Sequence, residues 1–268
     1  MNPQSLLESR LQLHYGIQFM AATAAVLVTP EPDYSHNALE WNPEKGYFQT
    51  KLLSDSSLRV VLKPGPLESL ILDGEGTVLS SFSLGGTTIA EGFSWLRATL
   101  TQMGINGAAI APLAYPTYDF PFHPIAHGGM FTTAGTEDRE ALARYYSISY
   151  QPLQEIASGN PQASPLHIWP HHFDMAILLS FPEEKSIGVG LSPGDQSYPM
   201  PYWYVTPWPY PAVEHLPSLA LGSWHTQEWT GAVLTAEEMG ELDAEKLQAF
   251  LKVALTASQT LLGMKNSS

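Results

Sequence analysis

The stretch Ser164–Phe181, SPLHIWPHHFDMAILLSF, places three histidines and an aspartate directly before an apolar run. Its aromatic and aliphatic content and its length predict a β-strand over about 166–181. Successive side chains of a strand point to opposite faces of the sheet. One face would then carry His167, Trp169, His171 and Phe173, and the other would carry His172, Asp174 and Ala176.

Pro170 leaves two other arrangements of this stretch open. Proline has no N–H and is tolerated in strands mainly at edges or bulges, and a bulge here would mix the two faces. A helix would instead align His167, His171 and Asp174 at i, i+4 and i+7, but an internal proline disfavours a helix. The strand is therefore the prediction for this stretch.

The same order of predicted helices and strands occurs twice along the chain. Before the strand, periodicity predicts a helix from Glu137 to about Ser158; after it we expect strands at 186–192, 201–207 and 222–234 and an amphipathic helix at 243–262. The first half is predicted to contain a helix over about 3–27, strands at 47–53, 57–63, 68–74 and 77–84, and an amphipathic helix at 87–104. A turn-rich segment, 105–135, joins the halves.

This order predicts an α+β fold of two pseudo-repeats, each a helix, four antiparallel strands and a helix. We expect both to pack as one compact unit, because no separate linker stands between them. The expected organisation is a single compact domain over 1–268 with two structural halves, at about 1–110 and 136–268.

Composition narrows the class of partner. The formal net charge is −14 with only 12 Lys and Arg residues, which argues against nucleic acid and against an anionic membrane surface. The apolar run at 19–28 is too short to span a bilayer. We therefore expect a cytoplasmic protein with a small-molecule partner; a homo-oligomer is compatible with the sequence.

The chain has no cysteine, so a metal would need His, Asp or Glu ligands. In the strand arrangement, His172 and Asp174 lie about 7 Å apart on one face and could reach a common metal or orient each other. We predict these two as catalytic residues and predict a divalent ion such as Zn, Mn or Fe. The predicted ligand set is His171, His172, Asp174 and His225; His127, His123 and Glu228 stay open as further ligands. A buried His–Asp pair that only satisfies hydrogen bonds is the structural alternative.

The segment 198–211 combines five prolines with six aromatic residues. Rigid aromatic faces bind small molecules at low entropic cost, and we predict an aromatic-lined cleft in the second half. The predicted ligand-binding set is His127, His167, Trp169, Tyr202, Tyr204 and Trp208. An enzyme built on this site would be a metal-assisted or His/Asp acid–base hydrolase. The alternative function is a non-catalytic interaction or dimerisation module that uses 198–211 as its surface.

Four motifs in chain order resemble a bacterial family of domains of unknown function. They are LQLHYGIQFMAATAAVL (11–27), PFHPIAH (121–127), SPLHIWPHHFDMAILLSF (164–181) and YWYVTPWPYP (202–211). The third is similar to the family's Ser-Pro-Val-His…Phe-Asp-Leu-Ala motif. The resemblance implies that His127, His167, Phe173 and Asp174 occupy motif positions. His171 and His172 depart from the family pattern, and no activity is implied.

Overall fold

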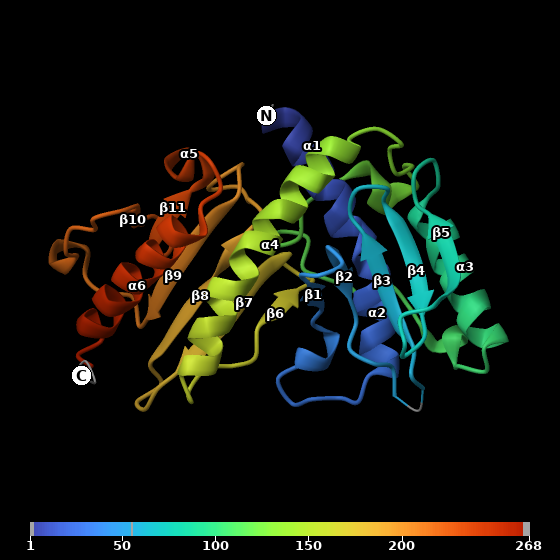
Figure 1. Ribbon diagram of the computed structural model, residues 1–268, viewed down its shortest axis with the longest axis horizontal. Helices are drawn as coiled ribbons and strands as arrows, with labels where there is room; N and C mark the ends of the chain where they lie inside the picture. Colours follow the sequence, from blue (N-terminus) through green and yellow to red (C-terminus); the bar gives the residue numbers. More distant parts are fainter. Residues whose placement is uncertain (1–2, 55, 265–268) are drawn as a thin grey trace. The chain divides into compact units, whose positions relative to one another are not determined.

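The computed structural model describes residues 3–54 and 56–264 and has an α+β fold (Figure 1). Its strands form two antiparallel sheets, of five and six strands, so the predicted fold class is confirmed. The chain divides into two compact units. Unit 1 is the chain up to Arg144 together with His167–Phe173, and unit 2 is Tyr145–Leu166 together with the chain from Asp174 onwards.

Unit 1 contains the first sheet and the helices that pack against it. Its helices are α1 (Pro3–Gly16), α2 (Gln18–Leu27) and α3 (Ile89–Gln102), and its strands are β1 (Glu40–Asn42), β2 (Tyr47–Gln49), β3 (Arg59–Lys63), β4 (Glu68–Leu72), β5 (Val78–Ser83) and β6 (His167–Trp169). Three short 3₁₀ helices complete it: η1 (Ser35–Asn37), η2 (Gly107–Ala109) and η3 (Pro124–His127). The first sheet is a meander in the order β1-β2-β3-β4-β5.

The predicted helix over about 3–27 is wrong in its continuity, because it is interrupted between α1 and α2. Gly16 ends α1 where the helix approaches the sheet. A Cβ at Gly16 would lie 3.1 Å from a methyl group of Leu62 and 3.4 Å from one of Leu84. Glycine allows this close approach, and its low helix propensity favours a break at the same place.

Helix α3 confirms the helix predicted over 87–104, although it begins and ends two residues inside those bounds. Thr88 and Glu91 form a capping box at its start, and Gly104 beyond its end has a φ of +81°. Gly92 leaves room for the ring of Phe19, since a Cβ there would approach that ring within 2.5 Å. Helix α3 is thereby held close to α2.

Unit 2 contains the other long helices and five strands of the second sheet. Its elements are β7 (Asp174–Ser180), β8 (Ser186–Ser192), β9 (Tyr202–Trp208), η4 (Val213–His215), β10 (Ser223–His225), β11 (Gly231–Thr235), α5 (Ala236–Met239) and α6 (Ala244–Leu261), together with the end of α4 (Thr136–Gly159), which starts in unit 1. These five strands have the order β10-β11-β9-β8-β7. Because β11 lies between β10 and β9 while the first sheet is a plain meander, the predicted pseudo-repeat is not confirmed.

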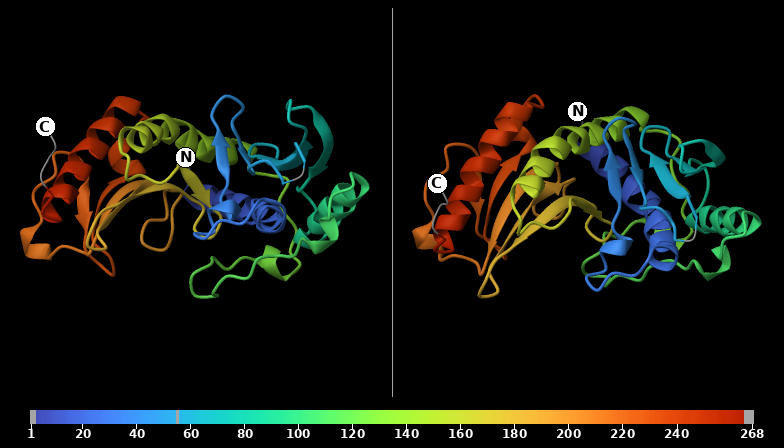
Figure 2. Two further views of the ribbon diagram at one scale, coloured as in Figure 1. Left: turned by 90° about the horizontal axis from the view of Figure 1, so that it is seen from below. Right: turned by 60° about the horizontal axis from the view of Figure 1, so that its bottom comes forward.

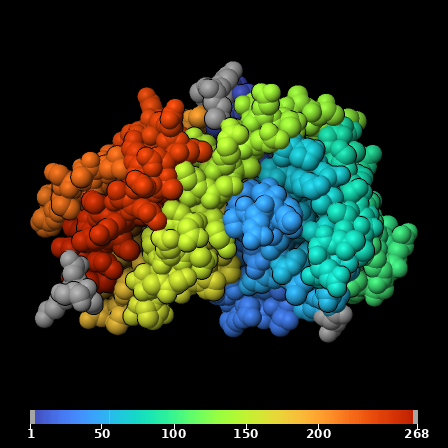
Figure 3. Space-filling view, in the orientation of Figure 1, coloured from blue at the N-terminus to red at the C-terminus, as the bar shows by residue number. Residues whose placement is uncertain are grey.

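The core of unit 2 lies between its sheet and two helices. Helix α6 and the later part of α4 lie on the same face of the sheet (Figures 1 and 2), and they form the molecular surface over it in Figure 3. Trp203 of β9 is fully buried there, and its indole N–H donates a 2.6 Å hydrogen bond to Ser149 of α4. Alternation along β9 therefore places Tyr202 and Tyr204 on the opposite face.

The predicted strand over 166–181 is wrong. Strand β6 ends at Trp169, residues 170–173 form a turn, and β7 begins at Asp174. The N–H of Phe173 donates a 2.7 Å hydrogen bond to the carbonyl of Trp169, and Phe173 has a φ of +60°. Pro170 has no N–H for a strand ladder, so the chain turns where the proline stands. The two predicted faces of this stretch therefore do not exist.

The predicted strand over 222–234 is wrong as well, since it is divided into β10 and β11. The residues between them leave extended geometry, and Glu228 has a φ of +64°. The prediction of a single compact domain over 1–268 stays a prediction. Among the described helices, none has both the length and the apolar character needed to cross a bilayer.

Candidate metal centre

Two side chains of the N-terminal helices, those of His14 and Gln18, hold the turn at 170–173 in place. The Nε2–H of His14 donates a 3.0 Å hydrogen bond to the carbonyl of Pro170, and the Gln18 amide donates a second, of 2.9 Å, to the same oxygen. Burial lowers the pKa of His14 to about 3, so its ring stays neutral. The turn is thus held by buried, neutral hydrogen bonds, and His171 and His172 lie on it.

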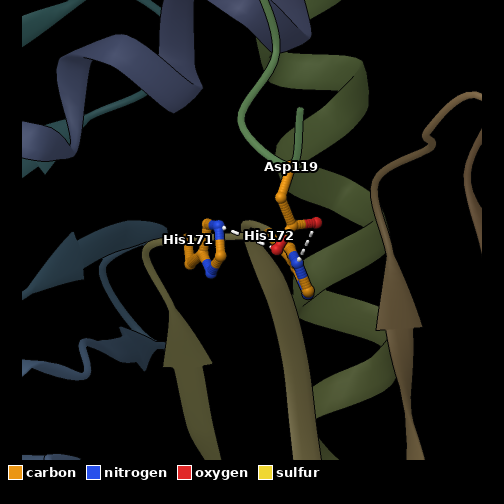
Figure 4. A group of neighbouring side chains, drawn as sticks. All are labelled: Asp119, His171 and His172. Atoms are coloured by element: carbon orange, nitrogen blue, oxygen red, sulfur yellow. Dashed lines mark hydrogen bonds and ion pairs between the residues drawn. The ribbon is translucent and has the colours of Figure 1, made fainter. Parts of the chain in front are cut away.

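The carboxylate of Asp119, which is 53 residues before His172 in the sequence, lies close to this turn. Residues 116–120 form a tight turn, in which the N–H groups of Asp119 and Phe120 donate hydrogen bonds of 3.0 and 3.1 Å to the carbonyl of Pro116. Asp119 lies on this turn. Figure 4 shows its side chain extending from the loop toward the two histidines.

Asp119, His171 and His172 form one cluster, the His/Asp centre. The Nε2 of His171 lies 3.2 Å from one oxygen of Asp119, and the Nε2 of His172 lies 3.2 Å from the other oxygen (Figure 4). The three ligand atoms all lie within 4.8 Å of one another. The His171 side chain is 31% exposed, whereas those of Asp119 and His172 are 42% and 58% exposed. Solvent therefore reaches the centre at Asp119 and His172, whereas the Nε2 atom of His171 is itself buried.

A column of aromatic rings connects the centre to the core of unit 1. Neighbouring ring centroids are 4.5 to 5.4 Å apart along the series Phe48, Phe173, His14, Phe120, Tyr115, His171 and His172. The ring of Tyr115 is almost parallel to that of His171, with an interplanar angle of 7°. Tyr115 and Phe120 flank Asp119 in sequence, so the column also fixes the segment that carries the carboxylate.

The Tyr115 hydroxyl of this column is in an unfavourable state. It is buried and has no hydrogen-bond partner among the described residues. Burial raises the pKa of Tyr115, so the hydroxyl keeps its proton. Leaving such a group unsatisfied costs about 1–3 kcal/mol. The energetic gain of stacking on His171 and Phe120 offsets this cost.

The two Asp119–imidazole separations suit a small divalent ion. Nitrogen and oxygen ligands lie about 2.0–2.2 Å from zinc, which places two ligand atoms roughly 3.0 Å apart at a right angle and 3.4 Å apart at a tetrahedral angle. The two Asp119–imidazole separations of 3.2 Å fall between these values. Two imidazoles and one carboxylate are also the donor set that iron(II) and zinc use.

Two predicted metal ligands, Asp174 and His225, lie outside the His/Asp centre. Asp174 accepts a 2.6 Å hydrogen bond from the hydroxyl of Tyr204. The Tyr204 ring crosses β8 over Gly190, because a Cβ at Gly190 would lie 2.7 Å from the Tyr204 hydroxyl oxygen. Burial, with the nearby Asp174 carboxylate, raises the pKa of Tyr204 well above its usual value. Asp174 thus belongs to a tyrosine–carboxylate pair on the sheet of unit 2.

The remaining residues near β9 form local contacts within unit 2. Tyr202 donates a 2.5 Å hydrogen bond to Asp195, and the Tyr198 hydroxyl lies 3.0 Å from Nδ1 of His225. His225 also stacks on Trp229 with centroids 4.2 Å apart. Both nitrogens of His225 are engaged, since its Nε2 donates to the carbonyl of Gln227.

The predicted ligand-binding residues are spread over the chain rather than gathered. His127 is exposed at the end of η3, beside Phe122, and His167 is buried on β6 against the edge of Trp169. Trp208, at the end of β9, is 51% exposed and meets Tyr210 edge-to-face. The segment 198–211 is therefore divided between core and surface and is not one continuous exposed patch.

Sequence reasoning placed two ligands of the centre, His171 and His172, and missed Asp119. One signal was present: Asp119 is the only acidic residue between Glu91 and Glu137. It stands in a turn-rich segment crowded with aromatic residues. A lone carboxylate in such surroundings is an unusual choice, and the long sequence separation hid its partners.

Compared with protein-family models, with curated proteins and with solved structures, the chain has no significant match. The resemblance to a bacterial family of domains of unknown function therefore stays a prediction.

Proposed function

We propose that the protein binds one divalent transition-metal ion at the His/Asp centre. The observation that carries this proposal is the position of Asp119. Each of its carboxylate oxygens lies 3.2 Å from the Nε2 of a different histidine, although Asp119 comes from a segment far away in the sequence.

Two nitrogen ligands and one oxygen ligand favour a metal ion of intermediate hardness over magnesium or calcium, which prefer oxygen ligands. Zinc, iron(II) and manganese(II) are the candidates, and neutral imidazole is a good ligand for the first two. Within the described part of the chain the ring column and the Pro170 hydrogen bonds already hold all three ligands near one point. Little ordering is then left for the metal to impose, which favours affinity.

The test measures zinc and iron(II) affinity by calorimetric titration of the purified chain. We expect single-site binding in the wild type. In Asp119→Asn, His171→Ala and His172→Ala, affinity should fall at least about 100-fold, because losing even an outer-shell partner costs 10–100-fold. His127→Ala and His215→Ala are matched controls, since both histidines are exposed and lie outside the centre.

Unchanged affinity in all three ligand variants would contradict the proposal, and so would equal losses in the two control variants. Circular dichroism of each variant separates ligand loss from unfolding. The centre is at least partly exposed, so we expect the ligand variants to keep the wild-type spectrum.

One observation favours the alternative function, an interaction module on 198–211. Trp208 and Tyr210 are 51% and 44% exposed and meet edge-to-face at 4.9 Å. Exposed aromatic pairs of this kind are frequent at protein interfaces. Trp203 and Tyr202 of the same segment are buried, at 0% and 5% exposure, which restricts such a surface to the end of β9.

A further inference from the structure

We propose that the metal at the His/Asp centre keeps adjacent open coordination positions and takes as its ligand a small anionic chelator with two oxygen donors. This inference rests on the proposed metal binding and names the substrate class of the same site. An α-hydroxy or α-oxo carboxylate has the required chemistry.

The ligand count gives the first reason. Within the ranges 3–54 and 56–264, the His/Asp centre supplies three ligand atoms, one from each of its side chains. Zinc takes four or five ligands, and iron(II) or manganese(II) take up to six. At least one and as many as three positions are therefore left for ligands from solution. Three protein ligands with open positions are typical of catalytic sites, whereas structural zinc sites are closed by four protein ligands.

The direction of exposure gives the second reason. His171 is the least exposed ligand and stacks closely between the rings of Tyr115 and His172. Asp119 and His172 are the more exposed ligands. The protein would thus cover a bound metal from the side of the ring column, and open positions would lie together on the exposed side. Adjacent open positions suit a bidentate ligand.

Charge gives the third reason. A divalent ion with one carboxylate and two neutral imidazoles has a net charge of +1. An anionic oxygen donor neutralises this charge, so it binds more strongly than a neutral donor of the same shape. The chelating arrangement adds affinity, because the second donor atom binds intramolecularly after the first.

The experiment uses cobalt(II) as a spectroscopic probe in the full chain. Its visible absorption changes with coordination number, so exogenous ligands can be titrated directly. Acetohydroxamate serves as the bidentate oxygen chelator and acetate as its monodentate counterpart. We expect a saturable spectral change with one acetohydroxamate per cobalt, and an affinity at least about tenfold above that for acetate.

The outcomes separate this inference from the proposed function. If cobalt(II) binds and Asp119→Asn abolishes its binding, but neither ligand changes the spectrum, the metal site stands and the open-position inference is overturned. If acetate and acetohydroxamate bind with equal affinity, the bidentate class of ligand is overturned, whereas the open coordination positions still stand. If cobalt(II) binding is the same in wild type and Asp119→Asn, the proposed function itself fails. His215→Ala, at an exposed histidine outside the centre, should behave like wild type throughout.

Discussion

At the scale of single residues, burial gives the histidines of this chain different chemical roles. His171 and His172 belong to the His/Asp centre, whereas His14 is buried and neutral and contributes a hydrogen bond to Pro170 and ring contacts with Phe120 and Phe173. His167 is also buried, and its Nδ1 has no hydrogen-bond partner among the described residues. Burial lowers the pKa of His167; nearby Lys51 lowers it further, while Asp33 and Glu40 oppose the shift.

This lowered pKa predicts a pH dependence of stability. Below about pH 6.5, the usual histidine value, the unfolded chain binds a proton at His167 that the folded chain does not bind. Protonation therefore favours the unfolded state, and the free energy of unfolding should fall as the pH drops below that value, by at most about 1.4 kcal/mol per pH unit. Above it this contribution is absent.

Urea unfolding of wild type and His167→Gln at pH 7.5 and pH 5 measures the effect, because the difference between the two proteins cancels all other titrating groups. The wild type should lose more stability between the two pH values than the variant does. Parallel losses would show that His167 is not the group responsible.

At the scale of elements, a glycine in a strand leaves the space in which a side chain from a neighbouring strand can cross it. Strand β8 carries Gly188 and Gly190 on the face that also bears Tyr204. A Cβ at Gly190 would lie 2.7 Å from the backbone oxygen of Met175 and 2.7 Å from the Tyr204 hydroxyl. A Cβ at Gly188 would meet nothing closer than 3.9 Å. The two glycines thus form a matched pair on one strand.

We expect Gly190→Ala to lower the free energy of unfolding by about 1–3 kcal/mol, because the new methyl group collides with backbone and displaces the tyrosine ring. Gly188→Ala should be neutral or stabilising by up to about 1 kcal/mol, since it only reduces the freedom of the unfolded chain. Chemical denaturation of the two variants measures both values. Similar effects in both would refute the crossing of Tyr204 over β8.

Elements governed by local periodicity and capping were predictable, and long-range contacts were not. The helix at 87–104 and the strand at 186–192 follow from caps and alternation within the segments themselves. Pro170 marks the position of the turn at 170–173, but from the sequence alone it is equally compatible with a bulge or an edge position in a strand. Asp119 could not be paired with His171 and His172, because their proximity depends on the packing of aromatic rings from four separate segments.

At the scale of the whole molecule, charge and exposed surface bear on self-association. The net charge of −14 repels a second copy at low ionic strength. Trp208 and Tyr210 are two rings at the end of one strand, whereas a stable interface buries about 1,200–2,000 Å². These rings alone are therefore too small to hold a dimer.

We expect Trp208→Ala/Tyr210→Ala to match wild type in two measurements. Light scattering at low salt should give the monomer mass for both proteins, and calorimetry should give metal affinities within about twofold of each other. A dimeric wild type that becomes monomeric in the double variant would contradict this expectation and favour the interaction module on 198–211.

The bond between Tyr204 and Asp174 has a consequence for how the sheet of unit 2 finds its alignment during folding. It joins β9 to β7, which are not neighbours, across β8. In the observed alignment Tyr204 lies beside Gly190, which pairs with Ala176, and its hydroxyl reaches Asp174 two residues along β7. If β9 slid by two residues so that Tyr204 stood over Gly188, the same reach would lead to Ala176 and no carboxylate; slid the other way, Tyr204 would meet Ser192 and no glycine. A single bond thus distinguishes the correct alignment of three strands from its nearest errors.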